Sequence, residues 1–192
     1  GAEFSPSIGR FAADGSTPRG NTPVKEGATV VVRGTGLDPY VNRCTTGVLF
    51  CDLGGNGTPI PADKAQGTFV VFGNFAESWR PSSGATSSLR KMDASNRGWL
   101  LAADTLNKDV PAEHREVIRG QWVELDPATG SFTWKVKLKE PSELVTGGKF
   151  GIYTYAGGVN TKNSAQELKA DLNFVPNDRT TTPDPEAKSG GL

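Results

Sequence analysis

Hydrophobic and polar residues alternate most clearly in Phe132-Thr-Trp-Lys-Val-Lys-Leu-Lys139. Aromatic and aliphatic residues occupy every second position there, and threonine and lysines occupy the others. A period of two residues is that of a β-strand with one buried face and one wet face. Residues 168–174 alternate in the same way. The pattern therefore predicts a strand in each segment.

Other strands are predicted where β-branched or aromatic runs end at turn residues, at 28–33, 67–73 and 149–155. The turn at 126–130 makes 121–125 the expected hairpin partner of 132–139. An edge strand is expected around Phe4 to Phe11. About seven strands separated by turns are typical of an immunoglobulin-like β-sandwich, so we expect an all-β fold of that class.

The stretch 76–120 lacks this alternation. Within it, 110–118 is expected to form a short helix with Pro111 at its first position. Because the stretch carries two tryptophans and several hydrophobic clusters, we expect a structured insertion that covers one end or edge of the sandwich. The sandwich itself is assigned to 24–175. It follows an N-terminal arm (1–23) and precedes a disordered linker or tail (176–192).

Composition narrows the classes of function. Glycine (24 residues) and proline (13) are frequent, which favours many short strands joined by turns. Lys+Arg and Asp+Glu both number 21, so the basic excess usual for nucleic-acid binding is missing. No segment approaches the ~18 apolar residues of a membrane span. If the protein is exported, the sequence shown has lost its leader.

The two cysteines are Cys44 and Cys51. A straight strand would place them about 23 Å apart, whereas a disulfide needs Cα atoms roughly 4.4–6.8 Å apart, so a bridge requires a turn between them. Gly47 can adopt the conformations of such a turn. We expect a disulfide, an oxidising compartment and a secreted or cell-surface location. The alternative is two unpaired thiols in a cytosolic protein. Two thiols and one histidine do not predict a zinc site.

The surroundings of the cysteines carry a family resemblance. Residues 27–39, Gly-Ala-Thr-Val-Val-Val-Arg-Gly-Thr-Gly-Leu-Asp-Pro, followed by Cys44-Thr-Thr-Gly-Val-Leu-Phe-Cys51, resemble the start of actinobacterial immunoglobulin-like domains of the neocarzinostatin type. Related exported domains occur in mycobacterial and corynebacterial cell-envelope proteins, whose final strands resemble 151–155 and 165–168. The resemblance implies an immunoglobulin-like fold, a hairpin disulfide and export. The second disulfide of the antibiotic-carrier members has no cysteines here, and no ligand-contact residue is transferred.

Five aromatic or cationic residues are candidates for ligand or partner binding. Trp79 and Arg80 place an aromatic ring beside a cation, a combination enriched in binding hot spots, and Trp99 lies in the same stretch. Tyr153 and Tyr155 share one strand face, and a tyrosinate can ligate haem iron. The alternatives are a tryptophan that fixes the loop on the core and tyrosines that pack within the sheet.

The remaining polar features have simpler interpretations. Lys135, Lys137 and Lys139 form a basic ladder that could meet an anionic wall polysaccharide or could deter pairing at a sheet edge. His114 lies in a charged run and is expected on a solvated helix face rather than in a catalytic triad. Asn56 begins a glycosylation sequon, which has little meaning in a bacterial protein.

The expected function is that of a non-enzymatic, exported binding module of an actinobacterial cell envelope, with a protein or envelope component as its partner. The insertion and the strand with the two tyrosines would form its contact surface. No metal, nucleic acid or transmembrane segment is expected. One alternative is a haem- or host-protein-acquisition domain, with haem as cofactor. Another is a structural spacer between an anchor and a distal domain.

Overall fold

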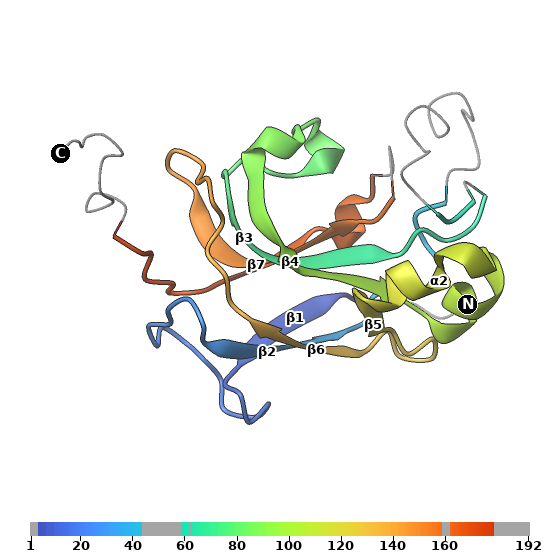
Figure 1. The fold of residues 1–192 in the computed structure, drawn as a ribbon, viewed down its shortest axis with the longest axis horizontal. Helices are drawn as coiled ribbons and strands as arrows, with labels where there is room; N and C mark the ends of the chain where they lie inside the picture. The colour runs from blue at the N-terminus through green and yellow to red at the C-terminus, as the bar shows by residue number, and fades with distance from the viewer. Residues whose placement is uncertain (1–3, 44–58, 62, 159–161, 179–192) are drawn as a thin grey trace.

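The computed structural model describes residues 4–43, 59–61, 63–158 and 162–178, and the regular structure in these ranges is mostly β-strand in two sheets (Figure 1). This agrees with the predicted all-β class. One sheet has three strands in the order β1 (Ser7–Phe11), β2 (Thr29–Thr35) and β6 (Phe132–Lys137). The other has five, in the order β5 (Trp122–Glu124), β4 (Arg90–Leu101), β3 (Thr68–Phe75), β7 (Lys149–Ala156) and β8 (Leu168–Asp171).

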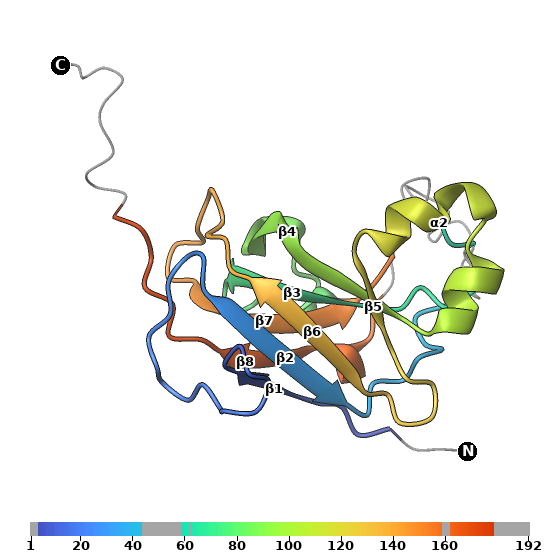
Figure 2. The same cartoon turned by 60° about the horizontal axis from the view of Figure 1, so that its bottom comes forward.

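The two sheets form two layers with the main hydrophobic core between them (Figures 1 and 2). Strand β6 alternates between buried and exposed residues along its whole length, as its sequence predicts. The core contains aliphatic and aromatic side chains from both layers: Val30, Val32, Phe132, Trp134 and Val136 from the three-stranded sheet, and Val70, Phe72, Leu100 and Ile152 from the five-stranded sheet. Burial of these side chains holds the layers together.

Close contact between the layers depends on Gly98 of β4. A Cβ atom at this position would lie 2.7 Å from Cγ2 of Val123 and 3.2 Å from Nε1 of Trp134. The space that a side chain would occupy is therefore taken by Val123 and Val70 of the same sheet and by the indole of Trp134 from the other layer. This is the physical reason for a glycine in the middle of a strand.

The outer face of the five-stranded sheet is also covered. The 3₁₀ turns η2 (Pro81–Ser83) and η3 (Ser87–Leu89) follow Trp79, which packs on this face. Beside them, the π-helical turn η4 (Thr105–Asp109) and helix α2 (Ala112–Arg119) cover a second cluster. The predicted helix is thus present, with Pro111 at its N-cap. A last 3₁₀ turn, η5 (Ser164–Gln166), precedes β8.

Two sequence predictions need correction. The stretch 76–120 is not an insertion throughout, because its residues 90–101 form β4, which lies between β3 and β5 in the five-stranded sheet. Its alternation is hidden because the β3–β4 register shifts between Val71 and Gly73. Strand β5 is not the hairpin partner of β6 either: it pairs in parallel with β4, and the turn at 126–130 connects the two sheets instead.

The ends of the described chain are held by specific contacts. The predicted N-terminal edge strand is present as β1, which pairs with β2. At the other end, the main-chain N–H of Asn177 donates to Oε1 of Glu140 at 2.6 Å, so the segment expected to be a disordered linker begins with fixed residues. The rest of that segment, like Cys44, Cys51 and Asn56, lies outside the described residues.

Candidate functional site: the free edge of strand β6

The aromatic residues predicted to bind a partner lie inside the protein. Trp79, Trp99, Tyr153 and Tyr155 expose only 2%, 5%, 1% and 7% of their surfaces. Three of them form one cluster with Phe75, whose ring stacks on that of Tyr153 with the centroids 4.0 Å apart. Trp99 belongs to the cluster under η4 and α2. These four side chains do not form an exposed contact surface, and the alternative of structural packing describes them.

The hydroxyl groups of the two tyrosines are not arranged as haem ligands. Tyr153 donates its hydroxyl proton to the main-chain oxygen of Lys149 at 2.8 Å, and burial raises its pKa to about 12. Burial also raises the pKa of Tyr155, against a smaller opposite effect of Arg90. The raised pKa values oppose formation of the tyrosinate that binds haem iron.

Arg80 and the turns that follow it act as a structural cover. The guanidinium of Arg80 lies 4.9 Å from the ring centroid of Trp79. Buried Glu167 holds this segment to the sheet, since its carboxylate accepts the main-chain N–H of Ser82 at 2.9 Å and the Ser82 hydroxyl at 2.6 Å. Arg90 donates to the main-chain oxygens of Trp79, Ala85 and Thr86. A binding surface must therefore be sought elsewhere.

Strand β6 lies at the end of its sheet and pairs on one side only, with β2. Leu138 donates its N–H to the oxygen of Ala28, on the β2 side, at 2.8 Å. Main-chain groups alternate in direction along an antiparallel strand, so those of Thr133, Lys135 and Lys137 point away from β2. In the described part of the chain, the N–H and C=O groups of Thr133 and Lys135 form no hydrogen bond on that side. We call the Thr133–Lys135 segment the free edge.

The free edge ends where Asn96 of β4 reaches across from the other sheet. Its side-chain amide donates to the oxygen of Lys137 at 3.1 Å and accepts the N–H of Lys139 at 2.8 Å. Asn96 is 1% exposed, so these two bonds satisfy an amide that would otherwise be buried without partners. The side chain thus makes the hydrogen bonds that a neighbouring strand would make, and it occupies the edge of the strand beyond Lys135.

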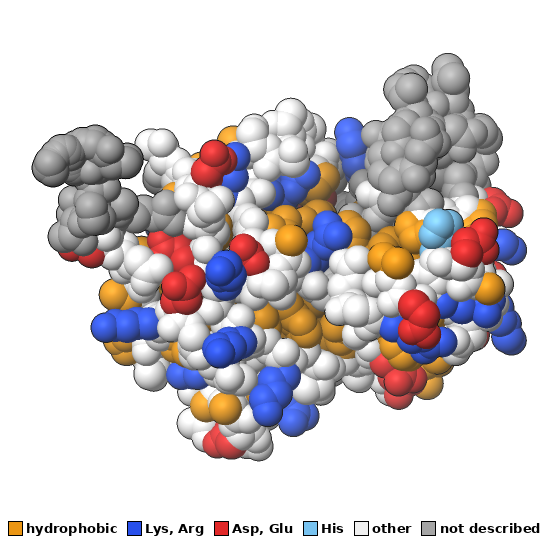
Figure 3. Space-filling model, in the orientation of Figure 1, with side chains coloured by type: hydrophobic (Ala, Val, Ile, Leu, Met, Phe, Trp, Pro, Cys, Tyr) orange, Lys and Arg blue, Asp and Glu red, His pale blue; other side chains and the backbone are white. Residues whose placement is uncertain are grey.

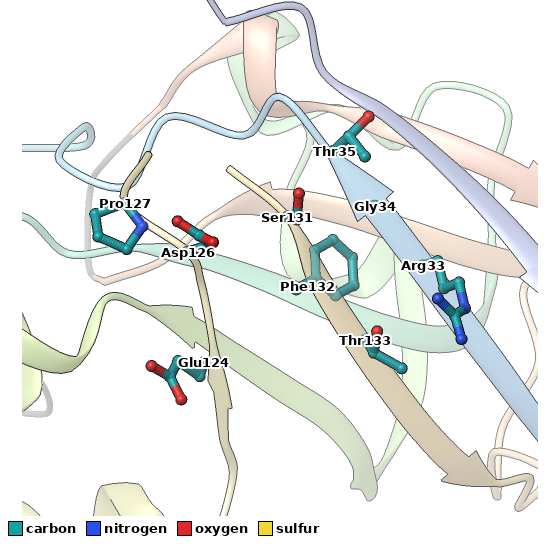
Figure 4. A pocket seen from close by; sticks show the side chains of 9 residues that line it. All are labelled: Arg33, Gly34, Thr35, Glu124, Asp126, Pro127, Ser131, Phe132 and Thr133. Carbon is teal, nitrogen blue, oxygen red and sulfur yellow. The ribbon is translucent and has the colours of Figure 1, made fainter. Parts of the chain in front are cut away.

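Two hollows flank the free edge. One, of about 460 Å³, is lined by Trp134, Asn96 and the three lysines of the ladder. The other, of about 610 Å³, lies between β5 and the start of β6. Figure 4 shows Glu124 and Asp126 on one side of this second hollow and Phe132 and Thr133 on the other. We call this side of the molecule, between β6 and strands β4 and β5, the open flank.

The open flank carries separated charges. Lys135, Lys137 and Lys139 are exposed on the outer face of β6, whereas Glu124 and Asp126 lie near its beginning. Figure 3, which looks onto this flank, shows hydrophobic side chains between the two layers and Lys and Arg side chains below them. An open hydrogen-bonding edge with charged residues beside it is suited to the addition of an extended segment as a further strand.

Sequence reasoning identified the lysine ladder but not the free edge or Asn96. Exposed lysines are typical of edge strands, and β6 is one, so the ladder was the available signal. The candidate histidine, His114, is exposed on α2. Within the described ranges, no three His, Cys, Asp or Glu residues are grouped as metal ligands require.

Among the residues that the structure describes, there is no helix of sufficient length and apolarity to cross a membrane. The comparisons with family models, curated proteins and solved structures gave no match to this chain.

Proposed function

We propose that this chain is a non-enzymatic binding module that holds a protein partner by adding an extended segment of that partner to the free edge of β6. The observation that carries the proposal is the outward direction of the main-chain groups of Thr133 and Lys135, which have no partner in the described chain. Strand addition uses these groups for affinity and the side chains beside them for specificity.

The distribution of carboxylates supports a role without catalysis. Glu140 and Glu167 are buried, but both accept main-chain N–H groups, from Asn177 and Ser82 respectively. Their charge is used to fix chain segments in place. A general acid or base needs instead a group directed at a substrate position.

The proposed setting is the cell envelope of an actinobacterium, to which the protein is exported. The resemblance of 27–39 and 44–51 to immunoglobulin-like domains supports this setting, as does the predicted Cys44–Cys51 disulfide. The two-layer arrangement is compatible with an immunoglobulin-like sandwich. The first test of the compartment is gel electrophoresis of protein isolated from its native host. A change in electrophoretic mobility on reduction would indicate the disulfide and hence an oxidising compartment.

Peptide selection combined with amide hydrogen exchange tests the binding mode. Peptides of ten residues would be selected from an unbiased displayed library on the immobilised full-length chain. We expect selected peptides to slow exchange at the amides of Thr133 and Lys135. Peptides that bind but protect other amides, or a library that yields no binder, would contradict the proposal.

A proline substitution provides the matched variant. In Thr133→Pro the lost N–H points away from β2, so the ladder with β2 keeps its hydrogen bonds while the free edge loses a donor. We expect binding of selected peptides to be lost in Thr133→Pro and kept in Thr133→Val, which preserves the N–H and a β-branched side chain. Circular dichroism of both variants verifies that they fold.

A further inference from the structure

The partner segment can be described further from the side chains that would face it, on the basis of the proposed strand addition. A strand placed beside β6 directs alternate residues to the outer and inner faces. Residues opposite Lys135 and Lys137 would lie on the outer face, beside the lysine ladder. Residues opposite Trp134 and Val136 would point inward, toward the hollow that those side chains line.

The charges on the outer face favour carboxylates in the partner. In the described chain, neither Lys135 nor Lys137 forms an ion pair. Lys139 differs, because it lies near two carboxylates, Glu26 and Asp93, and helps to lower the pKa of each. Lys135 and Lys137 are thus the positions left for an acidic partner, and cross-strand pairs of opposite charge are favourable.

At the opposite end of the free edge, a basic partner residue is favoured over an acidic one. Glu124 and Asp126 line the hollow beside Thr133. Arg33, the cross-strand neighbour of Thr133, lines the same hollow, so a partner residue opposite Thr133 would meet two carboxylates and one guanidinium. The excess of negative charge favours a lysine there over a carboxylate. The edge therefore has a charge polarity that sets where acidic and basic residues lie along a partner strand.

The same charges disfavour a second copy of this chain as the partner. Antiparallel pairing of two β6 edges centred on Lys135 would place Lys135 opposite its own equivalent in the partner copy. Like charges directly opposite each other destabilise a strand pair. A heterologous acidic segment suits the edge better than self-association.

We infer that the free edge of β6 takes an extended segment with alternating acidic and apolar residues and a basic end, bound antiparallel to β6. Read from the partner's N-terminus, an acidic residue lies beside the Lys137 side chain, an apolar residue faces Val136, an acidic residue faces Lys135, an apolar residue faces Trp134 and a basic residue faces Thr133. Main-chain pairing is confined to Thr133–Lys135, because Asn96 already binds the oxygen of Lys137. The antiparallel direction follows from the more stable ladder geometry.

Synthetic peptides test this inference. The first contains Glu-Val-Glu-Val-Lys, the second its reversed order Lys-Val-Glu-Val-Glu, and the third the charge-inverted Lys-Val-Lys-Val-Glu, each flanked by glycines and with blocked ends. Binding to the full-length chain is measured by fluorescence anisotropy at low and high salt. We expect the first peptide to bind at least about tenfold more tightly than the other two, with the difference reduced by salt. Equal or stronger binding of the reversed peptide would overturn the assigned direction.

Charge reversal on the protein provides the reciprocal test. In the double variant Lys135→Glu, Lys137→Glu, the first peptide should lose affinity and the charge-inverted peptide should gain it. Lys108→Glu, which changes an exposed lysine on η4, is the control that should leave both affinities unchanged. Sedimentation of the wild type should show no dimer formed through β6, and such a dimer would contradict the inference.

The outcomes separate this inference from the proposed function. If library-selected peptides protect the amides of Thr133 and Lys135 but are not acidic, and the charge-reversed variant binds them equally well, the inference fails and strand addition stands. If no peptide protects these amides, both fail.

Discussion

The two flanks of this protein join the same pair of sheets in different ways. On the flank where β1 and β8 lie, which we call the closed flank, Arg10 of β1 donates from Nε to the main-chain oxygen of Asp171 in β8, and its own oxygen accepts the N–H of Arg19. Val24 continues the connection through main-chain hydrogen bonds with Asn173 and Val175. The outward main-chain oxygen of Arg10, on the edge of β1, is therefore bonded by the chain itself.

On the open flank, Asn96 makes the corresponding contact between the end of β6 and the opposite sheet. Among the described residues, it is the only one with a hydrogen bond to this edge of the strand. The free edge beside it is left to solvent. The difference teaches that the molecule's own chain covers part of the β1 edge, at Arg10, but forms no such contact at Thr133 and Lys135. A sheet edge that is left open needs protection against aggregation, and exposed lysines such as those of β6 supply it.

Among the side chains that connect the two sheets at their flanks, removal of Asn96 should have the largest effect on stability. Asn96→Ala leaves the oxygen of Lys137 and the N–H of Lys139 without their partner, and we expect a loss of about 2 kcal/mol in the free energy of unfolding. Urea denaturation measures the loss. Ala94→Ser, an exposed change in the same bulge, is the control and should be neutral.

Amide exchange in the same variant tests whether the edge is open. Hydrogen exchange at the amide of Lys139 should become much faster in Asn96→Ala and approach the rate at Lys135. In the wild type, Lys135 should exchange faster than Trp134, whose N–H points to β2. Equal protection of Lys135 and Trp134 in the wild type would show that the edge is covered and would remove the basis of the comparison.

These features mark the limit of what the sequence could predict. Alternation located β6 because its period of two residues is a local property. Runs of β-branched or aromatic residues, which are also local, located the strands at 29–35 and 149–156. The choice of neighbour is not local. The turn at 126–130 predicted a hairpin, but β5 pairs with β4 because their buried side chains pack in the five-stranded sheet.

The candidate site was still harder to predict. β4 lacks alternation because its bulge sends Asn96 to the other sheet, and no periodic pattern reports a contact 41 residues away along the chain. Trp79 was a binding candidate because it lies beside Arg80, and Tyr153 because it shares a strand face with Tyr155. The structure places Trp79 and Tyr153 in the interior because the turns after Trp79 fold back onto the sheet. Whether a strand edge is free depends on every segment near it.

The closed flank should respond less strongly to the loss of one side chain. Arg10→Met keeps the aliphatic length of the side chain but removes its hydrogen bonds to the main-chain oxygens of Asp171 and Gly20. We expect a loss of about 1 kcal/mol in the free energy of unfolding, since both bonds are exposed. The smaller cost reflects the main-chain bonds of Val24, which remain. Arg33→Met, on the exposed outer face of the same sheet, is the control for the lost charge. A loss larger than that of Asn96→Ala would contradict the ranking of the two flanks.

The smallest expected effect is a difference in acid sensitivity at the far end of the open flank. Glu26 lines the hollow beside the lysine ladder, and its carboxylate accepts the N–H of Glu140 at 2.8 Å and the side-chain amide of Asn177 at 3.1 Å. These hydrogen bonds, the first above all, lower the pKa of Glu26 below its usual 4.5. A carboxyl group whose pKa is lower in the folded state stabilises the fold above its unfolded pKa and loses that contribution as the pH falls through the folded value.

The Arg10 contact on the closed flank is made to a main-chain oxygen and not to a carboxylate, so acid should weaken the Glu26 contacts without a matching change there. Urea unfolding of the wild type and of Glu26→Gln between pH 6 and pH 3 measures this effect. The contributions of the other carboxylates cancel when the free energies of unfolding of the two proteins are subtracted. We expect the wild type to be the more stable at pH 6 and the difference to vanish toward pH 3. Because Glu26 is exposed and screened by solvent, the difference should stay below that of Arg10→Met. A difference that grows as the pH falls would show that the charge of Glu26 destabilises the fold, and that the end of the open flank is held by other contacts.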